Sequence, residues 1–417
     1  MLRATGSVDA LSFSLEEVRF LAGALPRIGA MGPKLALTKA SVFADRTLLE
    51  REFGEHARAV AALISAQRAA TGKMPAGWLT DIDAAQQATS EPVARLRAHR
   101  LHQAGVTQVH DVTCSVGTEA PAFFRIGVEW MGSDVSRPRV AMARHNLGNG
   151  VWLVAADALT PVSTADVIVA DPARRVGGRR ITDPAHLQPP LPALLEAYRG
   201  RELAIKCAPG IDYSDWEGLV SVVSVDGGVK EVCLYTPGLA GGVDSATASL
   251  ASQGQGRVRE AVVMRADGFA ERCASTEADE VAVAPPGTFI LEPDGAVIRA
   301  GLVRHWAARH GLWMLDPHIA FVSGEAIPPG YSGFQLVETV SLKTLKRALA
   351  RHGAGSVEIL VRGVNVDPDL LRAKLKLKGE TPMAVVIARI GDTALAYICR
   401  AREHVPAGRS AESASGG

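Results

Sequence analysis

Apolar and polar positions alternate along the chain in ways that predict different structures in different regions. Apolar residues recur at helical spacing over residues 48–68, and Ser14-Leu-Glu-Glu17 has the form of a capping box, so residues 10–103 are predicted to be helical. From about residue 106 to residue 283, short apolar runs alternate with helical stretches. This alternation is typical of βαβ units and predicts an α/β fold with a mostly parallel sheet.

The pattern changes again beyond residue 285. Helices are predicted at 341–349 and 368–376, and strands at 357–362 and 383–389. Because 417 residues exceed one ordinary domain, several domains are expected. We predict a helical domain at 1–103, an α/β domain at 104–284, an α+β domain at 285–405 and a disordered polar tail at 406–417.

Charge is balanced over the whole chain but uneven within it. There are 45 basic and 44 acidic residues, so no global field attracts nucleic acid. Residues 341–379, however, hold nine basic and three acidic residues. This local excess, with Lys343, Lys346 and Arg347 at its start, favours contact with an RNA backbone, and the alternative is a charged helix face that only meets water.

Cysteine usage and hydropathy bear on the cellular compartment. The five cysteines are scattered without CxxC spacing, which indicates reduced thiols rather than disulfides or a zinc site. The first residues lack the apolar core of a signal peptide, and no apolar run approaches the ~20 residues that cross a bilayer. We therefore predict a cytoplasmic protein with no bound metal and no membrane partner.

The most informative stretch is Asp111-Val-Thr-Cys-Ser-Val-Gly117-Thr-Glu119, where an apolar strand ends in an acid and a turn of small residues leads into a helix. Such a junction offers backbone N–H groups to a ligand. Thr113 and Ser115 stand where glycines are usual, and the alternative is an ordinary strand–helix turn. Asp134 ends the next strand and is placed to bind two ribose hydroxyls, unless it serves only to cap a helix.

Two further strand ends point to the same crevice. Asp157-Ala158 has the position of an acid that meets an adenine amino group, with a plain loop aspartate as the alternative. Asp171-Pro172 ends a fourth strand and is the strongest catalytic candidate. Lys206 ends a buried strand, where it either pairs with Asp171 or contacts substrate, or is a lysine at a sheet edge that reaches water.

A basic loop follows the catalytic candidate. Arg174, Arg175, Arg179 and Arg180 surround Val-Gly-Gly, which suits contacts to a phosphate backbone, and a solvated charged loop is the alternative. In enzymes that methylate base amines, an acid in the position of Asp171 accepts a hydrogen bond from the amine and aims its lone pair at the methyl group. Catalysis of that kind is mostly positioning.

With these motifs, the chain resembles the bacterial class I S-adenosylmethionine-dependent methyltransferases that carry a THUMP-like C-terminal domain. The resemblance rests on LALTKASVFADRTLLEREF, DVTCSVGTE, ADPARRVGGRR, IKCAPGID, LEPDGAVIRAGL and SLKTLKRAL…EILVRGVNVDPDLLRAKLKLKG, and it covers nearly the whole chain. It implies a Rossmann-like core, S-adenosylmethionine as cofactor and RNA as substrate. Ser115 departs from the family, in which glycine more often follows the cysteine, and Thr118-Glu119 replace a Gly-Asp-like pair.

The resemblance also implies roles for single residues. Asp111 and Gly117 match the cofactor turn, Asp134 the ribose acid, Asp157 the adenine-side acid and Asp171-Pro172 the catalytic strand end. We predict a methyltransferase that acts on a base nitrogen of rRNA or tRNA. The alternatives are a non-catalytic RNA-binding protein on a degenerate scaffold, which the altered turn favours, and a methyltransferase for small molecules or proteins.

Overall fold

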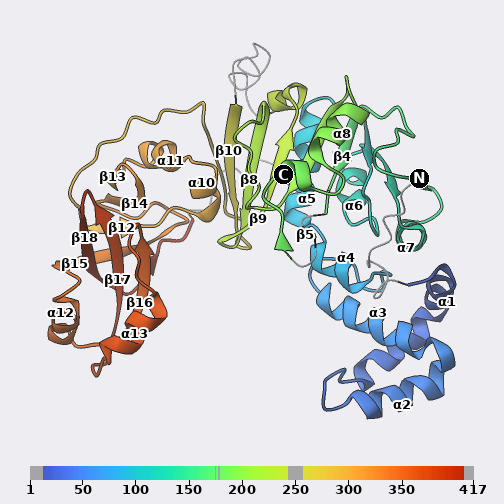
Figure 1. Cartoon of the computed structure of the whole chain (residues 1–417), viewed down its shortest axis with the longest axis horizontal. Coiled ribbons are helices and arrows are strands. Elements are labelled where there is room, and N and C mark those ends of the chain that lie inside the picture. The colour runs from blue at the N-terminus through green and yellow to red at the C-terminus, as the bar shows by residue number, and fades with distance from the viewer. Residues whose placement is uncertain (1–12, 174, 177–178, 243–256, 408–417) are drawn as a thin grey trace, which may run out of the picture. The chain divides into compact units, whose positions relative to one another are not determined.

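The computed structural model describes residues 13–173, 175–176, 179–242 and 257–407 (Figure 1). Contacts divide the chain into two compact units. The first unit contains Met1–Val220 and Glu231–Arg257, and the second contains Ser221–Lys230 and Val258–Gly417. The finer division into domains at residues 103, 284 and 405 stays a prediction.

Helices dominate the start of the first unit. The helices are α1 (Leu15–Met31), α2 (Val42–Phe53), α3 (Ala57–Ala69), α4 (Ile82–Gln87), α5 (Glu91–Gln103), α6 (Ala120–Phe124), α7 (Arg137–Leu147) and α8 (Leu191–Ala197), with 3-10 turns η1 (Gly32–Lys34), η2 (Gly54–His56), η3 (Pro184–His186) and η4 (Pro237–Gly242). The predicted capping box is confirmed: Glu17 N donates to Ser14 Oγ at 3.1 Å, and Ser14 N donates to Glu17 Oε2 at 2.8 Å. These two bonds fix where α1 begins.

The N-terminal helices share a core with the α/β part of the same unit. Val116 and Met142 belong to the apolar cluster that α1, α2 and α3 bury between them. Asn146, on α7, accepts a hydrogen bond from Leu79 N at 2.8 Å and donates to Val116 O at 3.1 Å. The helices are thereby attached to the turn that follows the first strand.

The first sheet has the strand order β11-β10-β8-β9-β7-β4-β1-β2-β3. Its strands are β1 (Gln108–Asp111), β2 (Glu129–Asp134), β3 (Leu153–Ala155), β4 (Val167–Ala170), β7 (Glu202–Cys207), β8 (Gly218–Val225), β9 (Gly228–Tyr235), β10 (Arg257–Met264) and β11 (Ala270–Ala274). Within the run β7-β4-β1-β2-β3, each strand is parallel to its neighbour. In contrast, β7 pairs antiparallel with β9, and β10 pairs antiparallel with β11. The predicted parallel sheet is therefore continued by antiparallel strands.

Strand order decides where a ligand can bind on this sheet. From β1 the chain runs outward to β2 and β3, and then returns to β4 on the other side of β1. The neighbouring connections therefore leave the sheet in opposite directions between β1 and β4, and a crevice opens at the carboxyl ends of these strands. All four residues of β4 are buried, as expected for a central parallel strand.

The second unit is built on another sheet, of order β13-β14-β12-β15-β18-β17-β16, in which β19 also pairs with β15. Its strands are β12 (Phe289–Leu291), β13 (Trp313–Asp316), β14 (Ile319–Gly324), β15 (Ser332–Ser341), β16 (Ala354–Arg362), β17 (Thr381–Ile390), β18 (Thr393–Arg400) and β19 (Glu403–His404), and its helices are α10 (Gly295–Arg299), α11 (Val303–Arg309), α12 (Leu345–Arg351) and α13 (Pro368–Leu375). Along β17, Val385 and Ile387 belong to one apolar cluster while Ala384 and Val386 belong to another. Both faces of this strand are therefore covered.

A bilayer needs a longer and more apolar helix than any that the described residues form.

Candidate active site

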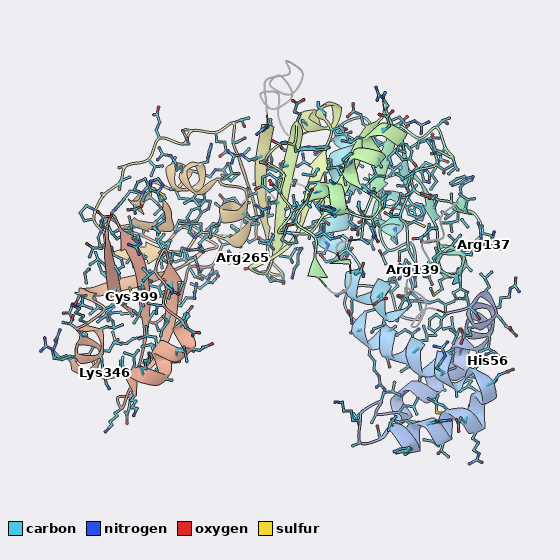
Figure 2. The ribbon with its side chains drawn as sticks, in the orientation of Figure 1. His56, Arg137, Arg139, Arg265, Lys346 and Cys399 are labelled. Atoms are coloured by element: carbon cyan, nitrogen blue, oxygen red, sulfur yellow. The ribbon has the colours of Figure 1, made fainter. Side chains whose placement is uncertain are left out.

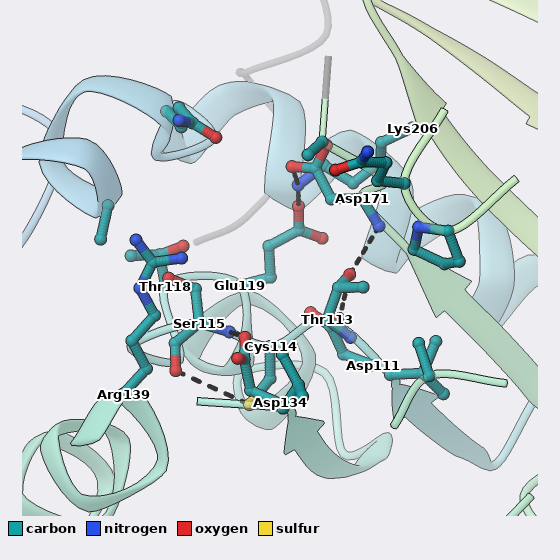
Figure 3. Close-up of a pocket in the computed structure, with 18 of the residues that line it drawn as sticks. Asp111, Thr113, Cys114, Ser115, Thr118, Glu119, Asp134, Arg139, Asp171 and Lys206 are labelled. Carbon is teal, nitrogen blue, oxygen red and sulfur yellow. Dashed lines mark hydrogen bonds and ion pairs between the residues drawn. The ribbon is translucent and has the colours of Figure 1, made fainter. Parts of the chain in front are cut away.

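A cavity of about 490 Å³ lies at the carboxyl ends of β1, β2 and β4, and Figure 3 shows it with its side chains. Its lining includes eight of the residues that the sequence singles out: Asp111, Thr113, Ser115, Asp134, Asp157, Ala158, Asp171 and Lys206. Residues from the ends of β1, β2, β3, β4 and β7 thus meet in one place. Gly117 and Pro172 are not part of the lining.

The turn after β1 has an unusual backbone. Ser115 has a φ of 51° and Gly117 a φ of 84°, so both adopt the left-handed conformation. A Cβ at Gly117 would lie 2.6 Å from Leu147 Cδ1, so glycine is needed there for space as well as for backbone angle. Ser115 adopts the left-handed conformation although it is not glycine. The serine that stands in place of the usual glycine is therefore compatible with this turn.

Thr113 joins the ends of two neighbouring strands. Its Oγ1 accepts a hydrogen bond from Asp171 N at 2.6 Å, and its own N donates to Asp111 Oδ1 at 3.0 Å. The threonine that replaces a glycine therefore fixes the end of β4 against the end of β1. Sequence reasoning placed Thr113 in the turn but gave no sign of this contact.

Asp134 holds the turn from the other side. Its Oδ2 accepts from Ser115 N at 2.9 Å, and its Oδ1 accepts from Ser136 N at 2.8 Å. Burial raises the pKa of the Asp134 carboxyl above its ordinary value. The helix cap that the sequence left open for Asp134 belongs instead to Ser136, whose Oγ accepts from Arg139 N.

Asp157 and Ala158 form a tight loop after β3. Asp157 Oδ1 accepts from Leu159 N at 2.8 Å, and the Ala158 carbonyl accepts from Tyr198 Oη at 2.9 Å. Both residues line the cavity, so a loop that is fixed by its own hydrogen bonds forms one wall.

Lys206 links the catalytic candidate to a buried network of charges. Its Nζ lies 2.7 Å from Asp171 Oδ2 and 2.6 Å from Glu119 Oε1. Arg97 lies 2.9 Å from Glu119 and 2.8 Å from Glu231. Since the Lys206 side chain is only 6% exposed and β7 lies between β4 and β9, the alternative of a lysine at a sheet edge is wrong.

The network sets the ionisation of its members. Burial opposes the charge of Lys206, but the carboxylates of Asp171 and Glu119 outweigh it and hold the lysine pKa above its ordinary value. Burial likewise opposes the charge of Glu119, yet Arg97 and Lys206 hold its pKa well below the usual range. For Asp111, burial and then the nearby Glu119 raise the pKa to about 7, although Lys206 works against them.

Arg97 and Glu231 do not line the cavity, but they extend the buried network of Lys206, and sequence reasoning missed both. They come from α5 and β9, far apart in the sequence, and both side chains are at least 95% buried. The only signal was Glu119, which departs from the family's turn. A buried ion pair produces no periodic pattern in the sequence, because each partner taken alone looks like a charged residue of the surface.

The candidate substrate-binding residues fall into two groups. Arg174 lies outside the described residues, while Arg175 pairs with Arg180 across two short strands, β5 (Arg175–Val176) and β6 (Arg179–Arg180), where the sequence predicts a loop. In the second unit, Lys343, Lys346 and Arg347 are exposed at the start of α12, on which Figure 2 labels Lys346. The described residues hold no group of three or more His, Cys, Asp or Glu side chains that could bind a metal ion.

The cavity has groups left over for a ligand of the predicted kind. Ser115 Oγ is buried, lines the cavity and has no hydrogen-bond partner in the described part of the chain. Each oxygen of Asp134 takes one backbone N–H and keeps a second lone pair that ribose hydroxyls can use. A nucleoside-bearing cofactor such as S-adenosylmethionine fits these donors and acceptors.

Comparison with known proteins agrees with this geometry. Residues 332–401 match the family model described as THUMP domain-like. Two strains of Mycobacterium tuberculosis, CDC 1551 and H37Rv, each have an uncharacterised S-adenosylmethionine-dependent methyltransferase that is 44% identical over 374 residues, which is 84% of this chain and 99% of the relative.

A solved structure shows the same fold. The structure of a candidate methyltransferase from Porphyromonas gingivalis W83 superposes with a TM-score of 0.66 at 17% identity, and covers 88% of this chain and 99% of the other. The predicted Rossmann-like core and THUMP-like region are confirmed, and membership of an enzyme family argues against a non-catalytic scaffold. The chain belongs to the S-adenosylmethionine-dependent methyltransferases.

Proposed function

We propose that this methyltransferase transfers its methyl group to a nitrogen of an RNA base, with Asp171 positioning that nitrogen. The observation that carries the proposal is the ion pair of 2.7 Å between Asp171 and Lys206 at the wall of the cofactor cavity. This pair supports Asp171 as a hydrogen-bond acceptor at the end of the strand where the methyl group is expected. The THUMP-like match at 332–401 and the exposed cations of α12 support RNA as the substrate.

S-adenosylmethionine, when bound, supplies an electrophilic methyl group on a sulfonium. Asp134 and Ser115 would hold its sugar, and Asp157 would face its base. Asp171 accepts a hydrogen bond from an N–H of the substrate amine, and this bond turns the nitrogen lone pair towards the methyl group. Lys206 pairs with the Asp171 carboxylate and holds it in place, and Thr113 fixes the backbone of Asp171 by accepting a hydrogen bond from its N.

Cofactor binding is tested by calorimetric titration with S-adenosylmethionine and S-adenosylhomocysteine. We expect micromolar affinity for the wild type and at least about tenfold weaker binding for Asp134→Ala, because two ribose acceptors are lost. Asp183→Ala is the control, since this carboxylate is exposed and does not line the cavity. Equal affinity in all three proteins would remove Asp134 from the cofactor site.

Methyl transfer is tested with labelled S-adenosylmethionine and total RNA from a strain that lacks the protein. Asp171→Asn is expected to reduce transfer about 100-fold or more while cofactor affinity stays within about threefold. Equal loss of both would contradict the positioning role of Asp171. Label that enters protein but not RNA would contradict RNA as the substrate.

A further inference from the structure

A second polar cavity, of about 530 Å³, lies within the second unit. Two sequence segments that the methyltransferase site does not use meet there: Glu292-Pro-Asp-Gly295, from LEPDGAVIRAGL, and Arg362, from the strand before GVNVD. The charged side chains of its lining are Asp226, Arg265, Glu292, Asp294, Arg362 and Arg402.

Arg265 is the exceptional member of this lining. Its guanidinium lies 5.2 Å from the ring centres of both Phe269 and Tyr331, so two aromatic faces hold it in place. Its Nε is buried and has no hydrogen-bond partner, and the described residues include no ion-pair partner for this side chain. Figure 2 labels Arg265 just after β10.

The other two arginines of the cavity have carboxylate partners. Arg362 donates to Glu292 Oε1 at 2.7 Å, and Arg402 Nε donates to Glu358 Oε1 at 3.2 Å. Among the three arginines of the lining, Arg265 is therefore the one without a carboxylate partner in the described part of the chain, and Asp226 and Asp294 are its acidic neighbours in the cavity. A buried Nε without a hydrogen-bond partner is costly, and an anion with planar pairs of oxygens is the natural complement of a guanidinium.

Two acids of the cavity each use one carboxylate oxygen to accept a hydrogen bond from a backbone N–H. Asp226 Oδ1 accepts from Ala266 N and Asp294 Oδ1 from Ala296 N, both at 2.8 Å. Their remaining oxygens are acceptors for hydroxyl or amino donors. A ligand for this cavity therefore needs an anionic end and a polar end that donates hydrogen bonds, and a nucleotide has both.

We propose that this cavity binds one nucleotide unit, with its phosphate on Arg265 and its ribose or base donors facing Glu292 and Asp294. Its volume falls within the usual range for pockets that enclose a small ligand, roughly 300–1,000 Å³. The proposal rests on the proposed function in one respect, because an RNA substrate would supply the nucleotide. A free mononucleotide offers the same chemistry.

The test uses the full-length protein and two probes, uridine 5′-monophosphate and a fluorescein-labelled single-stranded RNA of 12 nucleotides. Arg265→Gln is expected to weaken RNA binding about tenfold or more and to reduce the salt dependence by about one phosphate contact. Arg265→Lys keeps the positive charge but lacks the forked N–H groups of a guanidinium. It should therefore weaken RNA binding less than Arg265→Gln does. Arg400→Gln is the matched control, because Arg400 is exposed in the same unit, outside the cavity, and is expected to change RNA affinity less than twofold.

The outcomes separate the two sources of the nucleotide. Loss of RNA binding in Arg265→Gln without competition by the mononucleotide supports a nucleotide within a chain, and loss of mononucleotide binding alone supports a free nucleotide. The proposal is overturned if Arg265→Gln, with an unchanged melting temperature, binds both probes as tightly as Arg400→Gln does, or if the wild type binds neither. Methyl transfer to RNA that persists in that case would leave the proposed function standing.

Discussion

The two cavities differ in whether the cations that line them have carboxylate partners. In the active site, Lys206 and Arg139 have carboxylate partners at 2.6–3.0 Å. In the second cavity, the Arg265 guanidinium rests on aromatic rings and meets no carboxylate among the described residues. In the active-site cavity the cations are paired before any ligand binds, whereas in the second cavity Arg265 is left for a ligand to pair.

This difference teaches how each cavity is expected to recognise its ligand. Where the cations are already paired, they position carboxylates and backbone groups, and the ligand meets those groups. Where a guanidinium is unpaired, it is itself the recognition element. Removing an arginine should therefore damage stability in the first case and binding in the second.

The largest effect is expected for Arg97→Met. This change leaves Glu231 buried without its cation and leaves Glu119 with Lys206 alone, which should lower the free energy of unfolding by about 3–5 kcal/mol. Arg265→Met should cost less than about 1 kcal/mol, because no buried carboxylate loses a partner. Chemical denaturation of both variants measures the contrast.

Arg27→Met supplies the control for removing an arginine as such. Arg27 pairs with Glu52 at 2.9 Å, but both side chains are largely exposed, so a loss below about 1 kcal/mol is expected. If Arg97→Met cost no more than Arg27→Met, the buried network would not hold the active site together, and the comparison of the two cavities would fail.

Much of the fold could be predicted from the sequence because periodic burial leaves a periodic pattern. The alternation between 106 and 283 predicts the strands of the parallel sheet, and Ser14 with Glu17 predicts the start of α1. The short strands β5 and β6 were missed, since two basic pairs around Val-Gly-Gly carry no alternation of apolar residues. Strand order was inaccessible to periodicity alone, which says nothing about neighbours.

The candidate site could be predicted at strand ends and not beyond them. Asp111, Asp134 and Asp171 stand out because an acid after an apolar run marks the end of a parallel strand. Arg97 and Arg265 could not be found in this way. Their significance depends on which distant residues pack against them, Glu231 for one and Tyr331 for the other.

The next effect concerns cations that remain in water. Lys346→Glu combined with Arg347→Glu on α12 is expected to weaken RNA binding about 10- to 30-fold at 0.1 M salt, and to lower the salt slope by about two contacts. Because these side chains are exposed, mononucleotide binding should not change. Fluorescence anisotropy over a range of salt concentrations measures both quantities.

The double variant also tests whether α12 and the second cavity contribute to RNA binding in different ways. If α12 and Arg265 contributed in the same way, both would change the salt slope and neither would change mononucleotide binding. RNA binding that is unaffected by the double variant would exclude α12 as an RNA surface and leave the cavity as the remaining candidate in the second unit.

The smallest expected effect is a pH dependence of cofactor binding in the active-site cavity. Burial and the neighbouring Glu119 raise the pKa of Asp111 to about 7, so this carboxyl changes from mostly protonated to mostly ionised between pH 6 and pH 8. S-adenosylmethionine carries positive charge, and the ionised form should attract it more strongly. Affinity is therefore expected to rise with pH, by at most about tenfold over this range.

Asp111→Asn isolates this titration from those of the cofactor and of other residues. Its affinity profile should lack the rise centred near pH 7, while any titration of the cofactor itself remains in both proteins. Calorimetry at pH 6, 7 and 8 measures the difference between the two profiles. Parallel profiles would mean that Asp111 keeps one protonation state between pH 6 and pH 8, which would contradict its role in the pH dependence.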